Sequence, residues 1–170
     1  MNLFVLDYCH AYNALYHVDR HVVKMPLEAT QQVSTALHLV GAKGPYKPAF
    51  AKHPCTQWVA SSRAAYMWTC AYGLALCAEY AYRYSRRHKC ANILLECARQ
   101  AHLIPEGQWT TFAQAMPDQY KHQDAVTAYR AYYCGEKQHL ARWTGRAQPE
   151  WFLQNKVDWT IPSNILGVSN

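Results

Sequence analysis

Only one short segment of this chain has the pattern of a β-strand. Residues 2–7, NLFVLD, combine β-branched and aromatic side chains in a run of six that ends at Asp7. One strand cannot form a sheet, so we expect an isolated extended segment or a minor pairing. The rest of the chain must bury its apolar residues between helices. We predict a mainly α fold, a single compact helical bundle with one short N-terminal β-segment.

Helical periodicity and capping residues predict five helices in the rest of the chain. They cover residues 10–18, 19–40, 55–88, 90–103 and 125–143. Asp124 should cap the last of them, and the Gly- and Pro-bearing stretch over 104–123 is predicted to be irregular. No linker divides the chain. We therefore expect one helical domain over residues 1–170, with a core over 1–150 and a C-terminal tail over 151–170 draped along it.

The charge balance favours a polyanionic partner. The chain has 17 Lys and Arg against 11 Asp and Glu, which gives a net charge of +6 with His neutral. A net positive charge promotes association with polyanions through counterion release. Aromatic residues make up 14% of the chain, including 13 Tyr, and such side chains suit both a core and a surface that stacks on bases.

The cysteines indicate a reducing compartment. Seven Cys are scattered along the chain without a CxxC pair, and the apolar start is too short for a signal peptide. No apolar run approaches the roughly 18 residues that a membrane span needs. We therefore expect a soluble cytosolic protein with no membrane partner.

A polar stripe on the predicted second helix is the strongest candidate site. His21, Lys24, Glu28 and Gln32 fall within about 80° of one another on a helical wheel. With Asp7 at the end of the strand-like segment, this stripe supplies acids, bases and a phosphate ligand. The candidate catalytic residues are Asp7, His21, Lys24 and Glu28. The alternative is a solvated helix face in which these side chains bond only to one another.

Several cations elsewhere suit contacts with phosphate or DNA. They are Lys47, Lys52, His53, Arg83, Arg87, Arg130 and Lys137. Lys52 and His53 precede a predicted helix N-terminus, where free amides favour phosphate. Arg130 and Lys137 lie seven residues apart on one helix face and could hold one phosphate together. The alternative for Arg83 is a structural ion pair with the carboxylate four residues earlier.

Four further residues are candidates for contact with a substrate: Trp58, Tyr82, Asp118 and Tyr120. Tyr82 alternates with cations in EYAYRYSRRHK at 79–89, a pattern that suits a surface tracking a nucleic-acid backbone. Asp118 and Tyr120 lie together in the segment MPDQYK at 116–121. The alternative for Trp58 is a place in the core.

The sequence does not support a metal or nucleotide site. His17 and His21 have HxxxH spacing, but no second pair of ligands follows and HExxH is missing. A P-loop, a GxGxxG turn and a GxSxG elbow are also missing. We expect no metal and no cofactor.

Seven segments of the chain resemble a family of bacteriophage proteins in the same order. They are FVLD at 4–7, DRHVVKMPLE at 19–28, YKP at 46–48, HPCTQW at 53–58, EYAYRY at 79–84, MPDQY at 116–120 and AYRAYYCGEK at 128–137. The family is similar to phage amino acid:DNA transferases of thymidine hypermodification. Those enzymes replace the phosphate of 5-phosphomethyluracil in DNA with an amino acid such as glycine. YCHAYN at 8–13 stands where the family has an acidic-proline segment, so no role is carried over to positions 8–10.

The resemblance implies double-stranded DNA and a free amino acid as partners, and the cytoplasm of an infected bacterial host as location. Two other functions remain open at this stage. One is a DNA glycosylase or phosphohydrolase that activates water with Asp7 or Glu28. The other is a non-catalytic phage protein that binds DNA or counters host defence. The oligomeric state is not predicted.

Overall fold

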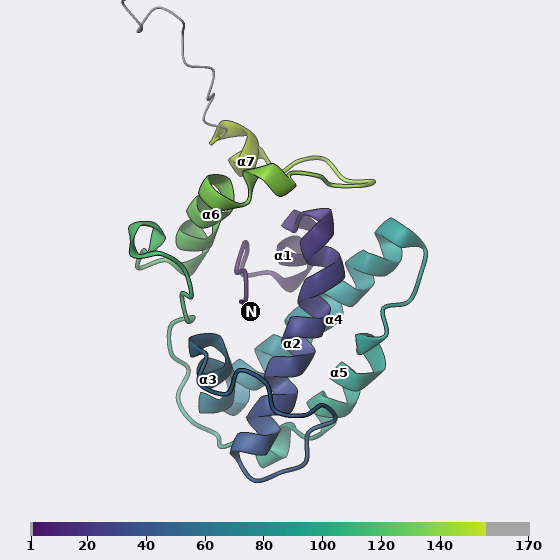
Figure 1. Cartoon of the computed structure of the whole chain (residues 1–170), viewed down its shortest axis with the longest axis vertical. Coiled ribbons are helices and arrows are strands. Elements are labelled where there is room, and N and C mark those ends of the chain that lie inside the picture. Colours follow the sequence, from purple (N-terminus) through teal and green to yellow (C-terminus); the bar gives the residue numbers. More distant parts are fainter. Residues whose placement is uncertain (1, 156–170) are drawn as a thin grey trace, which may run out of the picture.

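The computed structural model describes residues 2–155 of the chain (Figure 1). These residues form seven α-helices and three short 3-10 helices and contain no β-strand. The α-helices are α1 (His10–Tyr16), α2 (Asp19–Leu39), α3 (Pro54–Ser61), α4 (Arg63–Tyr84), α5 (Cys90–Arg99), α6 (Ala125–Glu136) and α7 (Glu150–Gln154). The 3-10 helices are η1 (Ala101–Leu103), η2 (Asp118–Tyr120) and η3 (Gln138–Leu140). The mainly α fold is confirmed.

Helices α2 and α4 form the centre of the helical assembly. α4 contacts α1, α3 and α5, and α2 contacts α3 and α5 as well as α4. Gly73 of α4 allows this close approach, because an added Cβ would lie 2.8 Å from Leu94 Cδ1 on α5 and 3.2 Å from Ala29 Cβ on α2. Helices α6 and α7 lie apart from this group, with the N-terminal segment between α6 and α2 (Figure 1).

The described residues contain no β-strand at the predicted N-terminal β-segment, so a minor pairing is not found, although these residues lie in the core. Residues 2–7 pair with no strand within the described part of the chain. The amides and carbonyls of such a segment need partners, which a neighbouring strand would otherwise supply. The run is nevertheless almost inaccessible to solvent at Leu3, Phe4, Val5 and Leu6.

Side chains take the place of a neighbouring strand along this segment. The Asn2 amide donates to Glu28 Oε2 at 2.9 Å, and Gln32 Nε2 donates to the Asn2 carbonyl at 3.2 Å. The Leu6 amide donates to Asn13 Oδ1 at 3.0 Å. The polar stripe of α2 therefore serves first as the hydrogen-bonding surface for the N-terminal segment.

The predicted helix over 55–88 is two helices. Ser62 interrupts it with an extended backbone, and its hydroxyl accepts from the Ala65 amide at 3.2 Å as the N-cap of α4. Ser is a preferred N-cap because its oxygen satisfies an amide that has no partner within the helix. The second of these helices ends at Tyr84, where Ser85 adopts a left-handed conformation.

The last long helix begins as predicted and ends earlier. Asp124 caps α6 by accepting from the Thr127 amide at 2.7 Å, which confirms that expectation. α6 ends at Glu136 instead of near residue 143. Trp143 instead packs against Phe152 and donates from Nε1 to the Tyr16 carbonyl at 2.9 Å. This tertiary contact competes with continuation of the helix.

Part of the predicted C-terminal tail is core. Phe152 of α7 is almost fully buried, and Trp151 packs edge-on against Tyr133 of α6. The remainder of the predicted tail, residues 156–170, lies outside the described residues. None of the helices within residues 2–155 combines the length and apolar character that crossing a membrane requires.

Candidate functional site

The polar stripe of α2 lies beside a small cavity that opens to solvent near Lys24. His21 and Glu28 are 7% and 6% exposed, whereas Lys24 reaches solvent. The cavity measures about 230 Å³ and is lined by Asn2, Phe4, His21, Lys24, Met25, Glu28, Ala115, Tyr132 and Lys137. We call it the stripe cavity. Pockets for drug-sized ligands measure roughly 300–1,000 Å³, so this cavity suits a single base or a small anion.

Glu28 is held in place within the stripe cavity by donors at both of its carboxylate oxygens. Lys24 Nζ lies 2.8 Å from Glu28 Oε1, one helical turn away. The Asn2 amide donates to the other oxygen, Oε2, at 2.9 Å. A carboxylate fixed at both oxygens keeps a defined orientation toward any group that enters the cavity. The same contacts mean that Glu28 also anchors the N-terminal segment.

His21 is a neutral imidazole. Burial, reinforced by nearby positive groups that include Lys137 and Lys24, lowers the pKa of His21 to about 3. Its Nδ1 lies 2.6 Å from Tyr133 Oη, which already accepts from the Val18 amide at 3.2 Å. The phenol hydrogen is therefore available to Nδ1, and the ring proton is assigned to Nε2. His21 thus offers a hydrogen-bond donor to the cavity and is not a base at neutral pH.

Lys137 supplies a second ammonium group from the C-terminal end of α6. Its Nζ lies 4.9 Å from the ring centroid of Tyr132, which also lines the cavity. Two lysines and one carboxylate leave the cavity with a positive balance. This balance favours a bound phosphate or carboxylate. The sequence placed Lys137 among the phosphate ligands, and the structure brings it to the predicted catalytic residues.

Asp7 does not join this group. Its Oδ1 accepts from the Cys9 amide at 2.9 Å, and its Oδ2 forms an ion pair with Arg130 at 3.2 Å. Arg130 also donates from Nε to the Leu6 carbonyl at 2.8 Å. Arg130 and Lys137 line different cavities. That these two cations hold one phosphate together stays a prediction.

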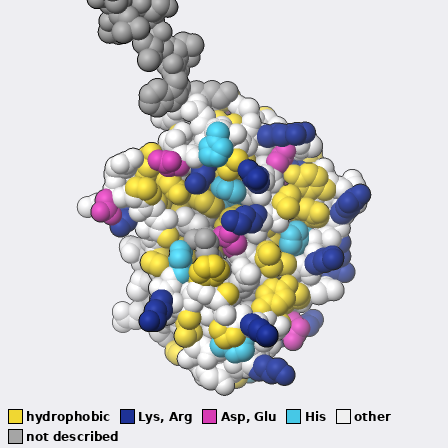
Figure 2. All heavy atoms as spheres, in the orientation of Figure 1, with side chains coloured by type: hydrophobic (Ala, Val, Ile, Leu, Met, Phe, Trp, Pro, Cys, Tyr) yellow, Lys and Arg dark blue, Asp and Glu magenta, His cyan; other side chains and the backbone are white. Residues whose placement is uncertain are grey.

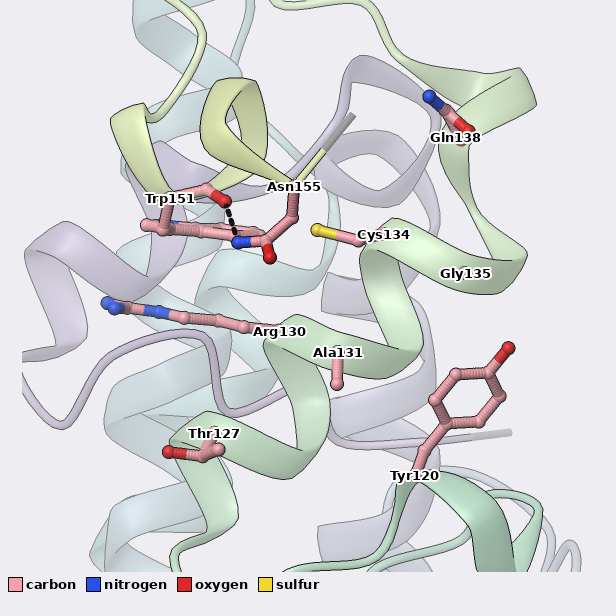
Figure 3. Close-up of a pocket in the computed structure, with 9 residues that line it drawn as sticks. All are labelled: Tyr120, Thr127, Arg130, Ala131, Cys134, Gly135, Gln138, Trp151 and Asn155. Carbon is pink, nitrogen blue, oxygen red and sulfur yellow. Dashed lines mark hydrogen bonds between the residues drawn. The ribbon is translucent and has the colours of Figure 1, made fainter. Parts of the chain in front are cut away.

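Arg130 lies in a second cavity, which residues of α6 and α7 line (Figure 3). This cavity measures about 480 Å³ and is lined by Tyr120, Thr127, Arg130, Ala131, Cys134, Gly135, Gln138, Trp151 and Asn155. Figure 3 shows the side chains of Arg130 and Trp151 extended side by side, and the guanidinium carbon lies 5.1 Å from the Trp151 ring centroid. The Asp7 carboxylate and the Trp151 ring therefore already engage the guanidinium.

Arg83 has a structural role in place of the predicted contact with phosphate. Its side chain is fully buried and forms ion pairs with Glu79 at 2.7 Å and Asp19 at 2.9 Å. It also donates to the carbonyls of Leu15 and His17, both at 2.9 Å. A guanidinium with this set of partners is not offered to an external ligand.

The other predicted phosphate ligands are distributed over the surface. Lys47 and Lys52 are exposed in the loop between α2 and α3. His53 is the N-cap of α3, where its Nδ1 accepts from the Cys55 amide at 3.2 Å, and burial lowers its pKa. Arg87 is exposed and lines a further cavity beside α2. None of these four residues lines the stripe cavity.

The predicted substrate residues also lie outside the stripe cavity. Trp58 is buried within a cluster of aromatic rings, which supports its core alternative. The Tyr82 ring is covered by the Arg146 guanidinium, whose carbon lies 3.6 Å from the centroid. Asp118 is exposed and paired with Lys121 at 2.7 Å. Tyr120 lines the cavity of Figure 3.

Sequence reasoning missed the partners that complete the stripe cavity. Asn2, Phe4 and Tyr132 line the cavity, and the Tyr133 hydroxyl orients His21 through its hydrogen bond with Nδ1. Tyr133 precedes Lys137 by one helical turn, so the i, i+4 spacing on α6 was a usable signal.

Comparison of the chain with protein-family models, with curated proteins and with solved structures finds no match. Within residues 2–155 no group of three or more His, Cys, Asp or Glu side chains is placed to hold a metal ion.

Proposed function

We propose that this protein is a DNA-modifying transferase that replaces the phosphate of 5-phosphomethyluracil in duplex DNA with an amino acid such as glycine. The observation that supports the proposal is the composition of the stripe cavity. It combines the Glu28 carboxylate, the neutral imidazole of His21 and the ammonium groups of Lys24 and Lys137 in one small space. These are the groups that removal of a phosphate by an amine requires.

The chemistry follows from the charges of these groups. The amine nitrogen attacks the methylene carbon, so a C–N bond forms while the C–O bond to phosphate breaks and the phosphate leaves with the electron pair. Lys24 and Lys137 stabilise the charge on the departing phosphate. Glu28 accepts the proton that the amine loses, and His21 donates from Nε2 to a phosphate or base oxygen.

The size of the stripe cavity suits one base outside the helix stack. An enzyme that reacts with a group on a base must take that base out of the duplex. Phe4 and Tyr132 supply apolar ring surface within the cavity, and Asn2 adds polar contact. A base held there would bring its 5-substituent among the charged groups of the stripe.

The test is mass analysis of nucleosides from duplex DNA that contains 5-phosphomethyluracil, after incubation with the protein and mixed amino acids. A nucleoside that carries an amino acid in place of phosphate supports the proposal and identifies the donor. Release of a free base identifies a glycosylase, and 5-hydroxymethyluracil with free phosphate identifies a phosphohydrolase. DNA that binds and stays unchanged identifies a binding protein. The last three results each overturn the transferase.

Glu28→Gln tests the assignment of the base. Glutamine retains an oxygen that can accept from the Asn2 amide but takes up no proton, so turnover should fall by about 10²–10⁴-fold while DNA affinity stays nearly unchanged. Glu96→Gln is the matched control, because Glu96 is exposed on α5. Thermal denaturation of both variants separates loss of chemistry from loss of fold. Full activity of Glu28→Gln with an intact fold would contradict this role.

A further inference from the structure

An exposed ridge runs along the N-terminal half of α2, on the opposite edge of the helix from its buried residues. Arg20, Val23, Lys24 and Leu27 are exposed at positions i, i+3, i+4 and i+7. We call these four residues the α2 ridge. Val23 and Leu27 are 47% and 42% exposed, so the α2 ridge presents apolar as well as cationic side chains to solvent.

The α2 ridge has depressions on its flanks as well as the stripe cavity. One, of about 450 Å³, is lined by Asp19, Arg20, Val23, Lys24, Tyr84, Arg142 and Thr144. Another, of about 480 Å³, is lined by Val23, Leu27, Tyr46, Tyr80, Arg86, Arg87, His88, Lys89 and Cys90. Val23 belongs to both, and Lys24 belongs to the first and to the stripe cavity. The three depressions therefore adjoin one another along the ridge.

The three depressions are strongly positive. Seven of the 17 Lys and Arg residues line them, namely Arg20, Lys24, Arg86, Arg87, Lys89, Lys137 and Arg142. Only two of the 11 carboxylates do so, and both are already paired, Asp19 with Arg83 and Glu28 with Lys24. Figure 2 shows Lys and Arg side chains spread over one face of the molecule with apolar side chains between them. This distribution complements a polyanion.

The depression beside Arg86 and Arg87 also has aromatic walls. Tyr80 and Tyr46 line it, and the Tyr80 ring meets the His88 ring edge-on with centroids 4.9 Å apart. Tyr, Arg and Lys side chains are among the groups that contact the phosphates and sugars of duplex DNA. The depression holds no acidic residue.

We infer that the α2 ridge and its depressions are the docking surface for the sugar–phosphate backbone of one strand of duplex DNA. From Arg20 to Leu27 the helix rises about 10 Å, which corresponds to about three nucleotides of one strand at 3.4 Å per nucleotide along the duplex axis. Cations on both flanks of the α2 ridge hold the DNA backbone. Lys24 belongs both to the ridge and to the lining of the stripe cavity. The inference rests on the proposed function only for the identity of the base that enters that cavity.

The test is binding of an unmodified fluorescent duplex, measured by anisotropy at a series of salt concentrations. The double variant R86A/R87A removes two phosphate contacts, so the slope of log K against log salt should fall by about 1.8. At 0.1 M salt that change corresponds to an affinity loss of about 60-fold. The matched control is R99A/K121A, which removes the same formal charge from exposed positions outside these depressions. Thermal denaturation confirms that both variants are folded.

Equal losses in the two double variants, or no loss in R86A/R87A, would overturn the inference. Failure of the proposed function is distinguishable, because the duplex carries no modified base. Loss of affinity confined to R86A/R87A supports the docking surface even where no new nucleoside forms. A new nucleoside formed with unchanged KM for DNA in R86A/R87A would overturn the docking surface while the transferase stands.

Discussion

Replacement of Arg83 by methionine should destabilise the fold by about 3–5 kcal/mol, the usual cost of removing one partner from a buried ion pair. The Arg83 guanidinium is fully buried and contacts Glu79, Asp19 and two carbonyls at the end of α1. Methionine is unbranched and apolar, and it supplies none of these donors. Each carbonyl left without a donor contributes about 1–3 kcal/mol to the loss.

Urea denaturation at pH 7, followed by tryptophan fluorescence, measures this loss. For a chain of this size each kcal/mol shifts Tm by about 2–4 °C, so the variant should melt about 6–20 °C lower. Arg99→Met is the control, because Arg99 is exposed at the end of α5. A loss below about 1 kcal/mol, as for a surface ion pair, would refute the structural role of Arg83.

The same variant should be more sensitive to acid. Burial by itself raises the pKa of Glu79, but hydrogen bonds and charges from Arg146 and Arg83 outweigh it and hold the pKa below its usual value. A carboxyl with a lowered folded-state pKa contributes stability above its unfolded pKa, and this contribution is lost as pH falls through the folded pKa. Without Arg83 the folded pKa rises, so acid unfolding should begin at a higher pH than in the original protein.

Two further predictions concern buried side chains: the first is a pH dependence of stability, and the second is the effect of replacing Leu6. Burial lowers the pKa of His17 to about 4 and that of His21 to about 3, so unfolding takes up about two protons below pH 6.5. The free energy of unfolding should therefore fall by up to about 2.7 kcal/mol per pH unit as the pH decreases near 5. Urea midpoints that stay constant from pH 6.5 to 4.5 would contradict a neutral state of His17 and His21 in the folded protein. Leu6→Ala should cost about 2–5 kcal/mol, because Leu6 is fully buried, while exposed Leu153→Ala should cost less than about 0.5 kcal/mol. Similar losses in these two variants, measured by thermal denaturation, would show that the N-terminal segment is not core.

The sequence predicted the features that depend on neighbouring residues. Helical spacing on α2 identified one polar face at His21, Lys24 and Glu28, and the structure places these three side chains around one cavity. The cap at Asp124 was predictable because its partner is the amide of Thr127, three residues away. Local geometry is set by backbone periodicity, so such features can be read without knowledge of the fold.

Contacts between distant segments were decided by the tertiary structure. Residues 2–7 have the composition of a strand, but side chains of Asn13, Glu28 and Gln32 satisfy this segment in place of a sheet. Arg130 and Lys137 share a helix face by spacing, yet Arg130 turns to Asp7 while Lys137 lies beside the stripe cavity. Which partner a long cationic side chain reaches depends on what packs against its helix. That information lies in residues more than a hundred positions away.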